Sequence, residues 1–481
     1  MYYLQKLYSL IFNPVFSLTS KIDERVRNAG ITLCCLFLTG FFIAYFDRAY
    51  TDLLYRHHGQ NNIICGSVMF ILILLSIKDP LKKVIWDRCI FTLMFLAGAG
   101  LVVIRFIHPT GTGYRSFGLM LMFFYPLLYY VWNNRGDYNL LFSRLSAATA
   151  VTGILFYIRV AHLALNGDLR IVAMRVTGTL HNANMFSMIG MVMICASTYM
   201  FLVNRSSKIW FVLSALSFGI GWSIVLMGVS RLSILVGAGS MFSFVVFWLK
   251  TKNTFTAAKS LKICFIRFSL VLITAILMVF VGNILLDINT EIAFQKYNEA
   301  SMESGSTEYI DQAEEDATDQ KDVSSAADRF SAEGKDLDGY TAGRINIWKR
   351  YAEHLNMIGN DMDQVDFKEL TGTSVRHAHN NFLEYGFRCG VPVAVIHLLV
   401  ELYAGIVCLI FLFGKKYTDP CYLFAVVFMV CYTVESLFDI ATVPFERHAP
   451  FYFYILLMLV FGRKQDLSRH SANATVSSRV E

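Results

Sequence analysis

The amino-acid sequence predicts an all-α polytopic membrane protein, a helix bundle of about twelve transmembrane helices with one large extracytoplasmic loop. Three observations predict this fold class. Hydrophobic residues make up 55% of the 481 residues and charged residues only 16%, the mean hydropathy is +0.49, and apolar runs of membrane-spanning length recur along the chain. A surface this poor in charge is unsuited to water. The net charge of +6 is therefore not interpreted as a sign of nucleic-acid binding.

The elements follow from the apolar runs, each about 17 to 25 residues long and bounded by charged or turn-forming residues. With twelve spans, both termini lie on the same side of the membrane. Placing them in the cytoplasm gives the inner segments about three times as many Lys and Arg as the short outer loops, as the positive-inside rule requires. The predicted spans lie near 31–46, 61–77, 89–107, 116–132, 145–165, 183–203, 209–227, 232–249, 263–286, 387–413, 420–438 and 449–462.

These spans divide the chain into five parts, and we expect the protein in a bacterial cytoplasmic (inner) membrane. The parts are a cytoplasmic interfacial segment (1–30), spans one to nine (31–286), an extracytoplasmic loop (287–386), spans ten to twelve (387–462) and a cytoplasmic tail (463–481). The loop is acidic, with 21 Asp and Glu against 9 Lys and Arg. Its stretch Ser301–Lys335 is rich in small and acidic residues, and we expect it to be flexible or weakly helical.

The second half of the loop predicts an amphipathic helix near 341–356 that lies against the outer membrane face or the mouth of the bundle. Four large apolar side chains recur there at helical spacing, and Thr341 is a plausible N-cap. The four side chains are Ile347, Trp348, Tyr351 and Leu355.

Familiar cofactor and metal signatures are missing from the sequence. The ten cysteines lie almost all in apolar runs and form no CxxC pair, and the chain has neither a GxxxxGK[ST] loop nor a GxGxxG motif after a strand. We therefore expect no cofactor and no metal. An enzyme built from this chain would take its energy from a substrate that is already activated and carried on a lipid.

Two arginines on the predicted outer side are candidate site residues. Arg231 follows an abrupt turn between spans seven and eight, where a guanidinium that anchors the helix at the membrane surface is the plainer explanation. Arg344 begins the amphipathic helix, where a solvated arginine would be ordinary. Its neighbour Trp348 indicates that this helix face is docked.

A third cluster, Arg376 to Gly386, leads into the tenth span and holds His377, His379 and Asn380. A histidine has an ordinary pKa of about 6.5, so it can accept a proton at neutral pH. Structural hydrogen bonding at a helix start is the competing interpretation, and metal binding is disfavoured because no third ligand stands at a suitable spacing.

The loop 170–184 is the fourth candidate, because Arg175 and Asn184 offer hydrogen-bond donors at the start of the sixth span; capping of the loop explains it equally well. Inside the spans, Arg159 and Glu401 are charges that burial makes costly, and one possibility is that they pair with each other.

Together these features resemble the O-antigen ligase and polymerase superfamily of membrane glycosyltransferases. The shared features are a dozen spans with a large outer loop before the last three, Ser230-Arg231 at a span start, Arg344-x3-Trp348, and His377-x-His379-Asn380-x2-Leu383. The motif resemblance covers about 230–235, 341–351 and 377–393. The ligase pattern of His-Asn, nine residues, Gly, two residues and Gly, Thr or Tyr fits up to Gly390 but has Val393 in its last position.

The resemblance implies metal-independent transfer of a glycan from undecaprenyl pyrophosphate. His379 would then be the general base, and Arg231 and Arg344 would hold the pyrophosphate and stabilise the leaving group. Asn380 would orient the histidine or a sugar hydroxyl, and His377 would contact a sugar or support the base. Arg376, Arg175 and Asn184 complete the predicted substrate-binding set.

Three alternatives stay open at this point. Within the family, a polymerase joins two lipid-linked glycans, whereas a ligase moves the finished chain to lipid A core or another acceptor; the departure at Val393 and the long acidic loop slightly favour a polymerase. A transporter of polysaccharide or lipid-linked oligosaccharide would also explain many spans with scattered charges. A structural partner in polysaccharide assembly would need neither the histidine nor the arginines.

Overall fold

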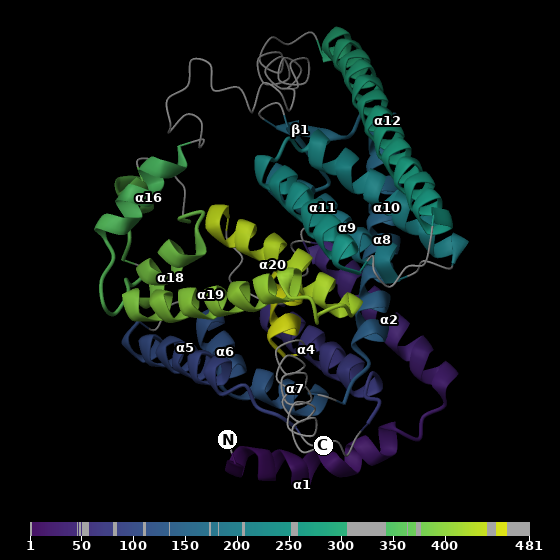
Figure 1. Cartoon of the computed structure of the whole chain (residues 1–481). Helices are drawn as coiled ribbons and strands as arrows, with labels where there is room; N and C mark the ends of the chain where they lie inside the picture. The colour runs from purple at the N-terminus through teal and green to yellow at the C-terminus, as the bar shows by residue number, and fades with distance from the viewer. Residues whose placement is uncertain are drawn as a thin grey trace. The chain divides into compact units, whose positions relative to one another are not determined.

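The computed structural model describes residues 2–458 apart from 46, 48–49, 51–56, 80–83, 109–111, 134, 173–174, 181, 204–206, 252–257, 305–342, 363, 372–376 and 440–448. The chain divides into two compact units. Unit 1 comprises Met1–Cys34, Gly59–Phe142 and Gly334–Glu481, and unit 2 comprises Cys35–His58 and Ser143–Glu333. Across the described residues the secondary structure is helical apart from one short β-hairpin and isolated bridges, so the all-α fold class is confirmed (Figure 1).

Among the residues that the structure describes, eight helices are long and apolar enough to cross a membrane. This finding supports a multi-pass membrane protein, and each of the eight coincides with a span that the sequence predicts. They are α2 (Glu24–Tyr45), α8 (Tyr138–Leu165), α9 (Ala183–Val203), α10 (Lys208–Met227), α11 (Arg231–Thr251), the part Ser269–Lys296 of α12 (Ala258–Ser304), α19 (Val391–Phe413) and α20 (Pro420–Phe438).

The other four predicted spans are shorter or interrupted helices. Three are α4 (His58–Leu75), α5 (Arg88–Ile107) and the helix Ala449–Met458, which contain apolar segments of 10–17 residues. The fourth is broken into α6 (Thr112–Leu119), the π-helix η1 (Met120–Phe124) and α7 (Tyr125–Trp132). Pro126 stands in the first turn of α7, where its missing N–H is tolerated. A bundle of twelve spans therefore stays a prediction.

Unit 1 places a small helical layer at the start of α19. That layer consists of α16 (Arg344–Glu353), α17 (Phe367–Thr371) and α18 (Asn381–Cys389), and α18 contacts both α16 and α19 (Figure 1). The sequence predicted one continuous span from 387. In the structure the helix is interrupted near this position, because Gly390 has a φ of 89° and separates α18 from α19. A Cβ at this position would lie 2.4 Å from the carbonyl oxygen of Met357, so glycine allows the close turn.

Two boundaries of the predicted outer loop also differ from the structure. The helix α12 does not end near 286 but continues to Ser304, so the first part of the predicted loop is helical. The amphipathic helix α16 begins at Arg344, and its N-cap is Gly343 with a φ of 77° rather than Thr341. Most of the acidic stretch Ser301–Lys335 lies outside the described residues.

Unit 2 is built around α9, which packs against α10 and α11, while α10 also packs against α12. Small residues allow the closest of these contacts. A Cβ on Gly190 of α9 would lie 2.5 Å from the carbonyl oxygen of Gly221 on α10, as expected of membrane helices that associate through small side chains. A hairpin of β1 (Arg170–Val172) and β2 (Arg175–Gly178) connects α8 to α9, and β2 packs on α9.

Candidate functional site

The segment before α18 holds His379 in a backbone conformation that side chains rarely adopt. His379 has a φ of 50°, in the left-handed region where residues other than glycine are uncommon. The next residue, Asn380, is the N-cap of α18: its side-chain oxygen accepts hydrogen bonds from the backbone N–H groups of Phe382 and Leu383 at 3.0 and 3.1 Å. Its amide nitrogen donates to the carbonyl oxygen of Leu437 at 3.0 Å. Asn380 thus fixes the histidine segment to the end of α20.

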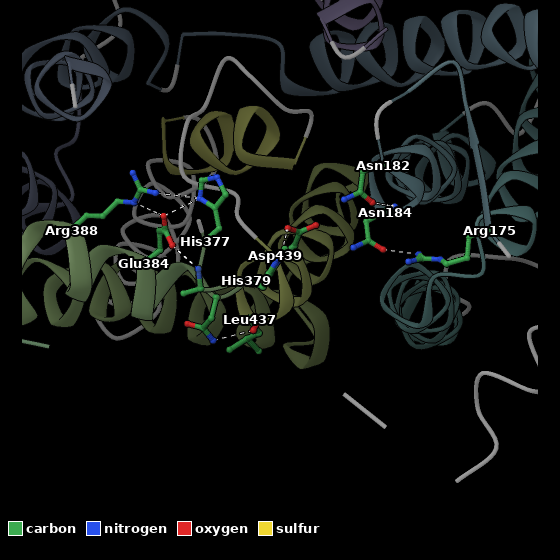
Figure 2. A network of polar contacts seen from close by, with 11 residues as sticks. Arg175, Asn182, Asn184, His377, His379, Glu384, Arg388, Leu437 and Asp439 are labelled. Carbon is green, nitrogen blue, oxygen red and sulfur yellow. Dashed lines mark hydrogen bonds and ion pairs between the residues drawn. The ribbon is translucent and has the colours of Figure 1, made fainter. Parts of the chain in front are cut away.

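That connection brings His379 to an acidic partner. The Nδ1 atom of His379 lies 3.5 Å from Oδ1 of Asp439, the residue that follows α20 (Figure 2). The separation is longer than a hydrogen bond, and Nδ1 makes none among the described residues. Both side chains are mostly buried, with 27% of His379 and 14% of Asp439 exposed. A carboxylate beside Nδ1 favours the tautomer that carries its proton there, which leaves Nε2 to accept a proton.

A second acid lies on the other side of the histidine segment. Glu384 of α18 is buried, and its Oε2 accepts a hydrogen bond from the backbone N–H of Ala378 at 2.8 Å. Its Oε1 lies 3.1 Å from Nδ1 of His377 and also pairs with Nε of Arg388 (Figure 2). Burial raises the pKa of Glu384, but the hydrogen bond from His377 and the charge of Arg388 outweigh it, so this pKa lies below its ordinary value.

The helix α16 packs onto this segment through its apolar face. Tyr351 is fully buried in a cluster with Ala378 and Phe387, and Ile347 and Leu355 pack against it. The docked face predicted from the sequence is therefore present.

The indole ring of Trp348 reaches the end of α20, with 6.1 Å between its centroid and that of Phe438, the residue before Asp439. Arg344 stands four residues before Trp348 and is half-buried. Residues four apart share a helix face, so Arg344 lies on the same face of α16 as Trp348. The contact of Trp348 with Phe438 thus brings α16 to the end of α20, beside Asp439.

Unit 2 contains a separate polar cluster at the start of α11. Nε of Arg175 donates to the carbonyl oxygen of Gly228 at 3.0 Å, and its Nη2 donates to Oδ1 of Asn184 at 2.7 Å (Figure 2). Gly228 opens the short turn that leads to Arg231, the first residue of α11. Within that turn Val229 has a φ of 46°, which is unusual for a β-branched residue. Two of the predicted substrate-binding side chains, Arg175 and Asn184, therefore contact each other, and Arg175 holds the turn before Arg231.

The charges inside the spans have other partners than the sequence suggested. Arg159 forms an ion pair with the buried Asp47, with Nη1 and Oδ2 3.0 Å apart. Glu401 instead accepts a hydrogen bond from the hydroxyl of Ser436 at 3.0 Å. The suggested pair of Arg159 with Glu401 is therefore wrong. Arg376 lies outside the described residues.

Sequence reasoning missed Asp439 and did not use Glu384. A lone acid directly after an apolar span was the available signal for Asp439, and the spacing of Glu384 to Arg388, one helical turn, was the signal for the buried pair. Among the described residues no three His, Cys, Asp or Glu side chains lie close enough together to hold a metal ion. The arrangement as described offers a histidine beside a carboxylate, groups that can accept and pass on a proton.

The fold and the candidate site together indicate the class of protein: a multi-pass membrane protein in which a histidine and a carboxylate lie close together at the end of the apolar helix α20. In a comparison with known protein families, residues 216–398 match the family described as O-antigen ligase. The matched segment is a little over a third of the chain and contains Arg231, Arg344 and His379. That family implies a glycosyltransferase of the O-antigen ligase or polymerase type, with lipid-linked glycans as substrates. Comparison with curated proteins and with solved structures gives no match.

Proposed function

We propose that the protein is a membrane glycosyltransferase that polymerises polysaccharide repeat units on the outer face of the bacterial inner membrane, using an undecaprenyl-pyrophosphate-linked donor. The observation that carries this proposal is the contact of His379, which lies inside the segment that matches the O-antigen ligase family, with Asp439, which lies beyond the end of that segment. A general base needs a basic atom free to reach the acceptor and a second group that orients the ring. His379 meets both requirements, because Asp439 faces Nδ1 and leaves Nε2 for the acceptor.

The reaction is a displacement at the anomeric carbon of the donor glycan. The acceptor hydroxyl oxygen forms the new bond to this carbon while its proton passes to Nε2 of His379. The bond from the same carbon to the pyrophosphate oxygen breaks, and its electron pair leaves with undecaprenyl pyrophosphate. A single displacement of this kind inverts the anomeric carbon.

Negative charge develops on the leaving pyrophosphate, and an arginine is suited to it because its guanidinium binds phosphate oxygens in a bidentate manner. In unit 1 the candidate is Arg344, on the same face of α16 as Trp348, whose ring reaches the end of α20. In unit 2 the predicted phosphate-binding residue is Arg231, in the turn that Arg175 holds. We propose that both arginines are required for turnover.

The preference for a polymerase over a ligase rests on the sequence pattern and on the acidic segment after α12. The departure at Val393 does not expose a different group to the glycan, because this residue is buried and its Cγ2 lies against Gly100 of α5. The alternative, transfer of a finished chain to lipid A core or another acceptor, therefore needs a direct test.

The test is the size distribution of undecaprenyl-linked glycan in cells that carry the wild type or a deletion. A polymerase predicts that the deletion accumulates single repeat units on the lipid. Long chains that remain on the lipid would instead identify a ligase. Lipid-linked glycan held on the cytoplasmic side of the membrane would identify a transporter and refute the proposed chemistry.

A further inference from the structure

The carboxylate of Glu384 is the most completely paired buried charge beside the histidine segment. Only 1% of its side chain is exposed, and its two oxygens meet three donors: the backbone N–H of Ala378, Nδ1 of His377 and Nε of Arg388. Burying a charged group is unfavourable in free energy unless its hydrogen-bond and ion-pair partners offset the loss of hydration. Two of the three partners, His377 and Ala378, are the residues directly before His379.

The strained backbone of His379 is held from both sides. On its C-terminal side, Asn380 caps α18 and bonds to the end of α20. On its N-terminal side, the Ala378 N–H is bonded to Glu384, and the methyl group of Ala378 is fully buried in the cluster with Tyr351. A left-handed conformation at a residue other than glycine persists only when its surroundings determine it. These contacts leave His379 little freedom apart from rotation of its side chain.

We propose that Glu384 is a positioning residue for the proposed base: its carboxylate fixes the peptide before His379 so that the imidazole faces Asp439. This inference rests on the proposed function, in which His379 takes the proton from the acceptor. Glu384 itself does not touch substrate. Its carboxylate is occupied by His377, Ala378 and Arg388, so it has no role in proton transfer.

The substitution Glu384→Gln tests this directly, because glutamine keeps the size of the side chain and presents an NH2 donor where three donors already converge. At least one contact to Ala378, His377 or Arg388 must be lost. The matched control is Glu369→Gln, the same chemical change on the exposed face of α17. A conservative variant, Glu384→Asp, keeps the charge but shortens its reach.

Two measurements on the full-length protein in detergent separate positioning from folding. The first is turnover of lipid-pyrophosphate-linked glycan. Glu384→Gln should lower kcat by roughly 100-fold, the loss typical of a misplaced catalytic group, while KM changes by less than about twofold because substrate contacts are intact. The second is the rate at which diethyl pyrocarbonate modifies His379, followed by peptide mass spectrometry with His377 resolved separately.

The expected result for Glu384→Gln is a changed rate of modification at His379 together with the loss of kcat, partial recovery of both in Glu384→Asp, and wild-type behaviour in Glu369→Gln. If Glu384→Gln does not fold, Glu384→Asp decides: a folded variant with reduced kcat and unchanged KM supports the proposal. Wild-type kcat in a folded Glu384 variant would overturn it. If His379→Ala is also fully active, the proposed function fails instead, and the two failures are thereby distinguished.

Discussion

Removing the guanidinium of Arg175 should loosen the turn that carries Arg231. The structure gives Arg175 two hydrogen bonds, to the carbonyl oxygen of Gly228 at 3.0 Å and to Asn184 at 2.7 Å. A hydrogen bond to a charged group contributes about 1.5–3 kcal/mol. Because Arg175 is half-buried, the lower value applies to each, so Arg175→Ala should destabilise the protein by about 3 kcal/mol. Arg175→Lys can keep one of the two contacts and should cost about half as much.

The assay is denaturant unfolding of the detergent-solubilised protein followed by tryptophan fluorescence, alongside glycan turnover. Arg170→Ala is the matched control, since Arg170 is an exposed arginine in the same hairpin, and it should change stability by less than about 0.5 kcal/mol. Turnover of Arg175→Ala should fall to nearly that of Arg231→Ala, because the turn at Val229 is no longer held. Unfolding of Arg175→Ala within about 0.5 kcal/mol of the wild type would refute the reasoning.

Three further predictions follow from single contacts. Asp439→Asn should lower kcat by about tenfold to a hundredfold with little change in KM, because the amide orients the ring of His379 poorly; equal steady-state rates would exclude the orienting role. Asn380→Ala should lower stability by about 1 kcal/mol through loss of the helix cap, and Asn380→Ser should recover part of it in the same unfolding assay. Asp47→Asn should destabilise the protein by leaving Arg159 without its ion pair, measured as a lower thermal midpoint; no change would show that the pair is dispensable.

Much of the fold could be predicted from the sequence because membrane helices are encoded in local composition. Every predicted span coincides with a helix or, near 116–132, with helices joined by a π-helical turn. The helix ends that differ from the predicted span limits depend on interactions outside the apolar runs. Gly390 interrupts an apolar stretch because the chain turns there, close to the backbone of Met357. The sequence alone does not show that contact. The extension of α12 to Ser304 adds polar turns, which a hydropathy scan cannot separate from a loop.

The candidate site could be predicted from the sequence only in part, for a related reason. His379 stood out because its neighbours form a recognisable motif, and the docked face of α16 followed from helical spacing. Three helices, α18, α19 and α20, separate Asp439 from His379 in the sequence, so only the packing of α20 reveals their contact. The hydrogen bond of Arg175 to the carbonyl oxygen of Gly228 depends likewise on how β2 packs against α9.

The measurement that tests the central claim most directly is release of undecaprenyl pyrophosphate by the purified protein from a lipid-linked single repeat unit, comparing the wild type with His379→Ala and with the exposed control Glu369→Gln. The account predicts release and chain growth by the wild type and the control, and loss of both in His379→Ala. Wild-type release by a folded His379→Ala protein would contradict it.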